Sequence, residues 1–270
     1  MKKDEMQENP LAVPSIDGGY TAILGSVGCI GDSLASGEHE WIDDDGKHHY
    51  FDIYEYSWGQ FLARKCGLKV LNFSRGGLTA HSFHEYAGYN QSFYPEKACK
   101  AYIVALGVND MKRIDNPDIY PDGFGDITDV DFHDYNNNRK SFVGDYVKIL
   151  QRIRELQPGA RIFLFTIPRG NRDNEGICDK HAEFVRTLPE YFKYTYILDF
   201  RKYAPKYDEE FKQKYFLSGH MNAMGYKWTA DMVATYIDYI IRHNVDDFRL
   251  IGMVGTKYYA EAEKMINGKK

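Results

Sequence analysis

A serine in a tight turn is the strongest candidate for chemistry in this chain. Ser33 stands in the segment Gly31-Asp32-Ser33-Leu34, directly after an apolar run that predicts a strand. A turn between a strand and a helix can expose the hydroxyl and the backbone N–H of a serine on the same side. A hydroxyl is a poor nucleophile until a base removes its proton, so the serine needs a base from elsewhere in the chain. The tripeptide alone is a weak signal, because many turns and helix caps share it.

A histidine far downstream is the candidate general base. His220 stands in Gly219-His220-Met221-Asn222, where a long helical pattern begins. Imidazole changes its charge near neutral pH, so it can take a proton from a hydroxyl and later return it. The context, rather than the residue type, selects His220. Competing histidines stand in loops or helical patterns without a comparable context: His48, His49, His81, His84 and His133.

Two segments between the serine and the histidine carry candidate donors for an oxyanion. Gly77 follows one predicted strand, and a glycine there lets its backbone N–H approach a substrate without a side chain in the way. Asn109, in Gly107-Val108-Asn109-Asp110, supplies an amide N–H, whereas an aspartate at that position would repel an oxyanion. Together with the Ser33 N–H, these two residues form the predicted oxyanion hole. Each alone suits an ordinary turn or cap, and their order along the chain favours the catalytic interpretation.

The order Ser, Gly, Asn, His resembles that of the SGNH (GDSL) hydrolase family, from about Thr21 to about Asn244. The register Asn72-x-Ser74-x-x-Gly77-x-Thr79 is similar to the second block of that family and selects Gly77 over Gly76. The resemblance implies a three-layer α/β/α, flavodoxin-like fold with a central parallel sheet. It also implies Ser33 as the nucleophile, His220 as the base, and no metal or organic cofactor.

One element of the family pattern is missing. The family usually has an aspartate three residues before the histidine, and this chain has Leu217 there. That aspartate accepts the Nδ1–H, fixes the tautomer and stabilises the imidazolium. Two alternatives remain. A backbone carbonyl, such as that of Leu217, orients His220 in a Ser-His dyad, which we favour. Otherwise a distant acid is the third member, with Asp199 at the end of the last predicted strand as the candidate, although a structural role also suits it.

Short apolar runs alternate with helical patterns along the chain. The predicted strands are Thr21–Ile30, Lys69–Phe73, Ala101–Leu106, Arg161–Ile167 and Thr195–Leu198. The predicted helices are Ser57–Cys66, Arg139–Leu156, Asn174–Tyr191 and Ala223–His243. Strands separated by helices predict right-handed crossovers and a parallel sheet with helices on both faces. The Ser33, Gly77 and Asn109 segments follow predicted strands, at the edge where such folds bind ligands.

The chain divides into an irregular segment 1–19, a hydrolase domain 20–244 and a C-terminal appendage 245–270. Two segments are expected to be insertions. Residues 38–56 are acidic and aromatic, and residues 111–138 are rich in Asp, Asn, Gly and Pro. Both leave the predicted active edge, directly after Ser33 and Asn109. A loop as long as the second is either functional or mobile.

The composition narrows the class of protein. With 270 residues and a net charge of -5, there is no electrostatic case for nucleic acid or an anionic membrane as the main partner. No stretch has the length of a bilayer-spanning helix, and the N-terminus lacks the apolar core of a secretory signal. The four cysteines are widely spaced, with no pair at metal-ligand spacing. These features predict a cytoplasmic protein and leave its oligomeric state open.

The family that the chain resembles includes carbohydrate acetylesterases, lipases, lysophospholipases and thioesterases, so the fold does not choose the substrate. The insertions beside the predicted site are polar and rich in tyrosine, and no amphipathic lid is apparent. They favour a serine esterase for a short-chain, acetyl ester of a carbohydrate or a similar polar alcohol. The alternative is a lipid or thioester acylhydrolase. A third reading is a ligand-binding member without catalysis, for which the missing aspartate is the only argument.

Overall fold

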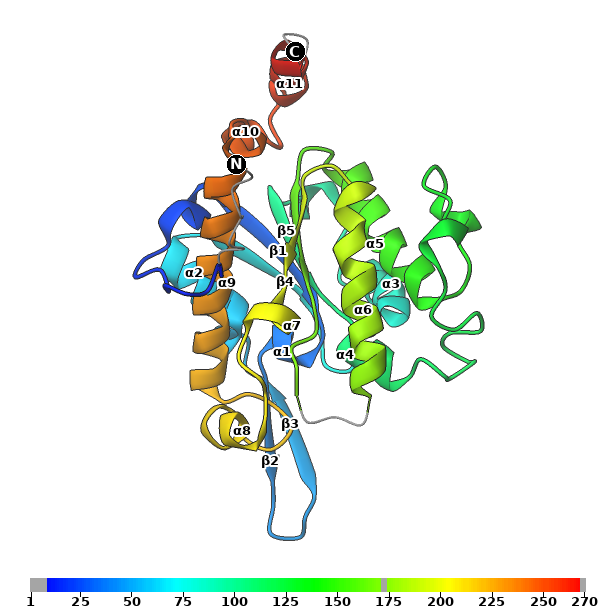
Figure 1. Ribbon diagram of the computed structural model, residues 1–270, viewed down its shortest axis with the longest axis vertical. Coiled ribbons are helices and arrows are strands. Elements are labelled where there is room, and N and C mark those ends of the chain that lie inside the picture. Colours follow the sequence, from blue (N-terminus) through cyan, green and yellow to red (C-terminus); the bar gives the residue numbers. More distant parts are fainter. Residues whose placement is uncertain (1–8, 171–173, 268–270) are drawn as a thin grey trace, which may run out of the picture.

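A parallel sheet of five strands forms the centre of the computed structural model, which describes residues 9–170 and 174–267 (Figure 1). Its strands are β1 (Ser26–Gly31), β4 (Lys69–Ser74), β5 (Ala101–Ala105), β6 (Arg161–Phe165) and β7 (Thr195–Leu198), in the order β4-β1-β5-β6-β7. Counted along the sheet-forming strands alone, this is the flavodoxin-like order 2-1-3-4-5, whose ligand crevice lies where the order reverses. The reversal lies between β1 and β5.

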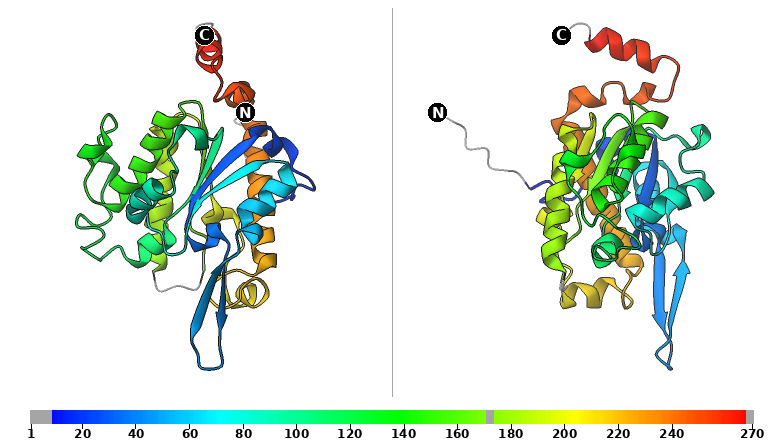
Figure 2. Two further views of the ribbon diagram at one scale, coloured as in Figure 1. Left: turned by 180° about the vertical axis from the view of Figure 1, so that it is seen from behind. Right: turned by 90° about the vertical axis from the view of Figure 1, so that its right-hand side faces the viewer.

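Helices cover both faces of the sheet, as Figures 1 and 2 show. On one face lie α2 (Trp58–Cys66) and α9 (Ala223–His243), and on the other lie α3 (Ala80–Tyr89), α5 (Phe142–Leu156) and α6 (Glu175–Thr187). Two clusters of buried apolar side chains fill the layers between the helices and the sheet. Because both faces are covered, β6 is buried at every position and has the continuous apolar pattern of a central parallel strand. The three-layer α/β/α prediction is confirmed.

The first predicted strand differs from the structure. Residues Gly19–Leu24 form a 3-10 helix, and β1 begins only at Ser26. Gly25 ends the helix with φ of 70°, a left-handed conformation that glycine adopts without strain. The Thr21 hydroxyl donates to the Ala234 carbonyl, so the 3-10 helix is hydrogen-bonded to α9. The predicted helix over Arg139–Leu156 begins three residues late, at Phe142, because Ser141 caps its N-terminus.

The segment 38–56 contains a hairpin that projects beyond the carboxyl end of the sheet (Figures 1 and 2). Strands β2 (Glu38–Ile42) and β3 (His48–Asp52) are antiparallel and form a two-stranded sheet of their own. The Asp43 carboxylate accepts from the N–H groups of Asp45 and Lys47 and closes the turn between them. The other expected insertion, 111–138, begins with the last two residues of an α-helix (Val108–Lys112) and continues as turns, bends and short 3-10 helices.

Short helices connect the remaining segments: α1 (Ser33–Ser36), α4 (Val108–Lys112), α7 (Phe200–Tyr203) and α8 (Glu209–Tyr215). After α9 come α10 (Val245–Phe248) and α11 (Tyr259–Asn267), which lie at the opposite end of the molecule from the hairpin (Figure 1). Residues 9–18 form turns and bends, and the first eight residues of the predicted irregular segment lie outside the described residues. The domain boundaries stay a prediction.

All four cysteines, Cys29, Cys66, Cys99 and Cys178, are buried. Across residues 9–170 and 174–267, no helix has both the length and the apolar character needed to cross a membrane.

Candidate active site

The serine turn lies at the carboxyl end of β1, as predicted. Ser33 is the first residue of α1, and the Asp32 carboxylate caps that helix by accepting from the Leu34 N–H at 3.1 Å. Asp32 is almost fully buried, and burial raises its pKa to about 6 against the opposing effect of this hydrogen bond. Asp32 therefore shapes the turn that presents Ser33.

The two loops predicted to supply oxyanion donors adjoin this turn. The Asn109 amide nitrogen lies 3.2 Å from the Leu78 carbonyl oxygen and 3.4 Å from Asp32 Oδ2. Gly77 has φ of 76°, in the left-handed region that favours glycine, and a Cβ atom there would meet no other atom within 4 Å. Asn109 thus connects the nucleophile turn to the glycine loop, and one side of that loop is open.

A buried aspartate fixes these loops to each other. Asp110 is fully buried, and its Oδ1 accepts from the Ala80 N–H at 2.6 Å and from the Tyr120 hydroxyl. Burial raises its pKa to about 6, against the opposing hydrogen bonds from Tyr120 and Ala80. The contact joins the start of α4 to the start of α3. It holds Asn109 and Gly77 in adjoining loops.

His220 lies just before α9, in a turn closed by the Leu217 N–H, which donates to the His220 carbonyl at 2.8 Å. The Leu217 side chain is about half exposed and carries no acid. The backbone carbonyl that we favoured for the ring is not its partner. Instead, His220 Nδ1 lies 3.0 Å from Glu40 Oε2, on strand β2. The sequence did not suggest Glu40.

Glu40 is an ionised carboxylate held by several donors. It is 4% exposed, and besides His220 it contacts His48 Nδ1 at 2.5 Å and the Gly219 N–H at 2.6 Å. Burial opposes ionisation, but the hydrogen bonds from His48, His220 and Gly219 outweigh it and lower the pKa of Glu40 to about 2. The anion is therefore present throughout the pH range in which imidazole titrates.

A second glutamate contacts the other ring nitrogen. Glu38 Oε1 lies 3.1 Å from His220 Nε2, and the side chain is mostly buried. Burial and the nearby carboxylates of Asp52 and Glu40 raise the pKa of Glu38. Among the described residues, no hydrogen bond joins the Ser33 hydroxyl to Nε2. Glu38 thus occupies the position at Nε2 that the Ser33 hydroxyl must take for proton transfer. Catalytic hydrogen bonds are often long or misaligned until substrate binds.

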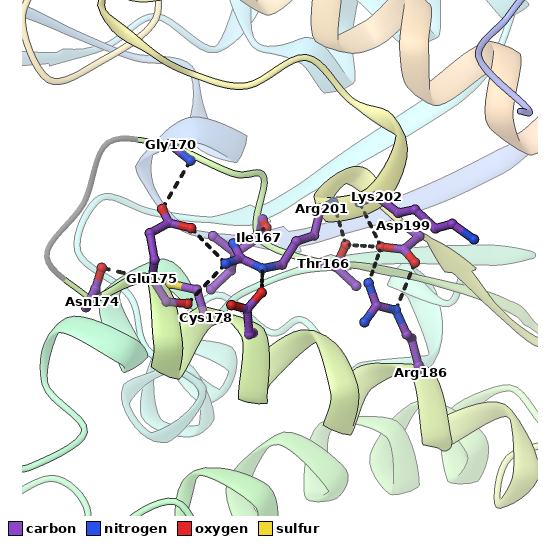
Figure 3. Close-up of polar contacts among 11 residues, drawn as sticks. Thr166, Ile167, Gly170, Asn174, Glu175, Cys178, Arg186, Asp199, Arg201 and Lys202 are labelled. Carbon is purple, nitrogen blue, oxygen red and sulfur yellow. Dashed lines mark hydrogen bonds and ion pairs between the residues drawn. The ribbon is translucent and has the colours of Figure 1, made fainter.

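Asp199, the candidate third member, lies in a different network at the end of β7 (Figure 3). Its carboxylate accepts from Thr166 Oγ1 at 2.9 Å and from Arg186 Nε and Nη2 at 2.8 and 3.0 Å. The same carboxylate caps α7 by accepting from the Lys202 N–H. His220 is not among its partners. Asp199 therefore has the structural role at the strand end, because its oxygens are committed to Arg186 and Thr166.

Sequence reasoning missed Glu38, Glu40 and His48, all within the segment treated as an insertion. A signal was present, since successive strand residues alternate between the two faces of a hairpin. On either side of the turn, this alternation places six residues on one face: Glu38, Glu40, Ile42, His48, Tyr50 and Asp52. Nothing in the pattern shows that this face meets a histidine almost two hundred residues away.

A small, mainly apolar cavity is lined by chain neighbours of Ser33, Asn109 and His220. Asp32 and Leu34, on either side of Ser33, help to line it, as do Val108 and Met221, the neighbours of Asn109 and His220. Phe165 and other buried side chains of the sheet and helices complete the lining, and the cavity measures about 60 Å³. A water needs about 10–15 Å³ on such a measure, so the cavity has room for only a few heavy atoms.

Several solved structures have a similar fold. Similar solved structures include a family two carbohydrate esterase from Clostridium thermocellum in complex with cellohexaose (13% identity, TM-score 0.53), with 82% of this chain and 65% of that one covered. The chain thus spans just under two thirds of that esterase's length. An acetyl xylan esterase, AlAXEase, is 14% identical with a TM-score of 0.50, over 77% of this chain and 97% of that one.

A structure described as a GDSL-like lipase from Parabacteroides merdae is 16% identical with a TM-score of 0.52, over 78% of this chain and 95% of that one. At these identities the likeness concerns the fold. A search of curated proteins found no match. A model of the GDSL-like lipase/acylhydrolase family matches residues 29–228, most of the chain. The chain therefore belongs to the GDSL-like lipase/acylhydrolase family.

Proposed function

We propose that this protein is a serine esterase that hydrolyses carboxylic esters through an acyl-Ser33 intermediate. The observation that carries the proposal is the arrangement at the carboxyl end of the sheet. There the Ser33 turn adjoins the Gly77 and Asn109 loops, while His220 is held through Nδ1 by a buried carboxylate. A nucleophile, donors for an oxyanion and an oriented base are the parts that acyl transfer requires.

In the proposed reaction, substrate displaces Glu38 from Nε2 of His220. The imidazole then takes the proton of the Ser33 hydroxyl as Oγ attacks the ester carbonyl carbon. The N–H groups of Ser33, Gly77 and Asn109 stabilise the oxyanion, and the imidazolium returns its proton to the leaving alcohol. A water molecule, deprotonated by the same imidazole, attacks the acyl carbon; the bond to Ser33 Oγ breaks, Oγ takes the proton from the imidazolium, and the carboxylic acid leaves.

The preferred substrate is a short-chain, acetyl ester of a carbohydrate or a similar polar alcohol. A cavity of about 60 Å³ beside Ser33 suits an acyl group of few carbons. The surroundings of His220 are polar, with Glu38, His48 and Tyr50 on the facing side of the hairpin, which suits a hydroxylated alcohol. The two esterases of similar fold are named as carbohydrate and acetyl xylan esterases, which supports the same choice.

A series of chromogenic esters from acetate to decanoate, together with acetylated xylan, tests this proposal. The acetyl ester is expected to have the highest kcat/KM, because each methylene that an apolar pocket cannot hold loses about 1–3 kcal/mol. A maximum at long chains would favour the lipid or thioester acylhydrolase. A folded protein that binds sugars and hydrolyses no ester would favour the binding member.

Two variants test the assignment of the reacting residues. Ser33→Ala and His220→Ala are each expected to remove nearly all esterase activity, and the double variant should be little worse than either, because the residues act as one unit. Initial rates on the acetyl ester measure this. Additive losses, or an active Ser33→Ala protein, would reject the nucleophile.

A further inference from the structure

We propose that Glu40, carried by the hairpin β2–β3, is the positioning carboxylate for His220 and replaces the acid that the family usually has at the position of Leu217. This inference rests on the proposed esterase function, since a positioned base matters only for a Ser33 nucleophile. It assigns a defined role to the segment 38–56, which leaves the sheet directly after the nucleophile helix α1.

The ring geometry supports this assignment. A neutral imidazole carries one proton, and a carboxylate can only accept. With Glu40 Oε2 at 3.0 Å from Nδ1, a proton stays on Nδ1, and Nε2 becomes the acceptor once substrate displaces Glu38. That is the tautomer a base needs to take the Ser33 proton, and the carboxylate then stabilises the imidazolium that forms.

The glutamate itself is held in place from two sides. The His48 ring and the Gly219 N–H both bind its carboxylate, on the hairpin and on the histidine turn. A Cβ atom at position 219 would lie 2.6 Å from Glu40 Oε2, so only a glycine fits against the carboxylate there. The residue beside His220 is thus shaped to receive Glu40.

The base of the hairpin is anchored to the elements that carry the nucleophile and the histidine. The Ser36 hydroxyl, at the end of α1, donates to Asp52 Oδ1 at 2.7 Å. The Tyr226 hydroxyl, on α9, donates to the Glu38 carbonyl at 2.5 Å. The Tyr50 ring meets the His220 ring edge-on, with centroids 5.7 Å apart. These contacts give Glu40 a fixed place relative to both reacting residues.

Several other titratable groups face this pair and shape its response to pH. They are Glu38 at Nε2 of His220, Asp32 in the nucleophile turn, Asp52 beside Glu38, and His48 and Tyr50 on the hairpin. Glu40 alone contacts Nδ1, so its removal changes both the charge next to the ring and the tautomer. None of the others contacts Nδ1 directly, and His48 affects this contact only through its hydrogen bond to Glu40.

The experiment compares Glu40→Gln and Glu40→Asp with Asp43→Asn in the same hairpin. Glutamine can donate to Nδ1 and favour the wrong tautomer, so kcat for the acetyl ester is expected to fall about 10³–10⁴-fold with little change in KM. The acid limb of the kcat/KM profile should move to lower pH, because the imidazolium loses an adjacent negative charge. Glu40→Asp should restore part of kcat. Asp43→Asn removes the charge that faces His49, a residue that is not among the contacts of His220 in the described part of the chain, and should match the parent.

The tautomer of the parent protein provides a measurement that needs no variant. Ring ¹⁵N shifts of His220 above its titration should report the proton on Nδ1, whereas a proton on Nε2 would overturn the inference. A folded Glu40→Gln protein with the parent's kcat and pH profile would overturn it as well. Esterase activity that persists in Ser33→Ala would instead refute Ser33 as the nucleophile, and the tautomer would still decide the role of Glu40.

Discussion

Two glutamates separated by one residue contact opposite nitrogens of the same imidazole. Glu40 lies at Nδ1 and Glu38 at Nε2, 3.0 and 3.1 Å from the ring of His220. Their charges are equal, but their consequences differ, because Nδ1 must keep a proton while Nε2 must be free to accept one. Glu40 therefore supports the reaction, and Glu38 competes with Ser33 for the base.

Glu38→Gln is expected to extend activity to lower pH. The ionised Glu38 stabilises the protonated ring, so removal of its charge should move the acid limb of kcat/KM down by about one pH unit. The plateau value of kcat should rise or hold, because Ser33 then meets less competition at Nε2. The pH profile of the acetyl ester measures both quantities. A collapse of the plateau, as expected for Glu40→Gln, would instead mean that the reaction needs Glu38.

For single residues, sequence motifs predicted correctly the positions that depend only on the end of the preceding strand. Ser33, Gly77 and Asn109 each follow a strand, and the parallel sheet brings those strand ends together. The partner of His220 was different. Its position depends on how a hairpin leans against a distant turn, and Asp199 was considered only because it ends a strand. The end of a strand predicts where a residue lies along the sheet, but not which side chains donate hydrogen bonds to its carboxylate.

At the scale of elements, the sheet and its long helices were predictable, because buried strands are continuous apolar runs and α9 has a helical apolar stripe. The hairpin was not predicted as a pair of strands, since its polar sequence resembles that of a loop.

The Asp199 network joins three elements: Arg186 on α6 contacts the carboxylate that caps α7 after β7 (Figure 3).

Asp199→Asn should therefore affect stability rather than chemistry. The variant keeps one acceptor for Thr166 and loses the charge that faces Arg186, which is partly exposed. A loss of about 1–2 kcal/mol is expected, equivalent to a fall in Tm of about 2–8 °C. Thermal unfolding and kcat/KM below the transition measure the two effects. A folded variant whose kcat/KM collapses would restore Asp199 as the third catalytic member.

At the scale of the whole molecule, buried titratable groups set the response of stability to pH. Burial lowers the pKa of His84 and His181 from 6.5 to about 3. Their contribution to the free energy of unfolding is therefore present above pH 6.5 and is lost as pH falls toward 3. Burial raises the pKa of Asp32 and Asp110 from 3.8 to about 6. Their contribution is present below pH 3.8 and is lost as pH rises through 6.

Between pH 6 and 4 these two pairs oppose each other, each group contributing about 1.4 kcal/mol per pH unit. We expect a nearly constant Tm in that range and a steep fall below pH 4, where the histidines act unopposed and Glu40 begins to protonate. Thermal unfolding at half-unit steps from pH 3 to 8 checks this. His84→Gln should make the fall in Tm below pH 4 shallower. A Tm that declines steadily from pH 6.5 would show that the histidines and the aspartates do not oppose each other.

Catalysis depends on the stability of the projecting hairpin, which is separate from the stability of the central sheet. Within the described chain, β2 and β3 form a separate two-stranded sheet, and beyond its anchored base Trp41 and Phe51 are more than half exposed. A two-stranded hairpin is marginal in water by itself, and such units open locally at less cost than a core. Since Glu40 travels with the hairpin, warming should switch the esterase off reversibly while the central sheet is still folded. The temperature of half-inactivation would then lie below Tm, and cooling would recover the activity without any refolding of the core.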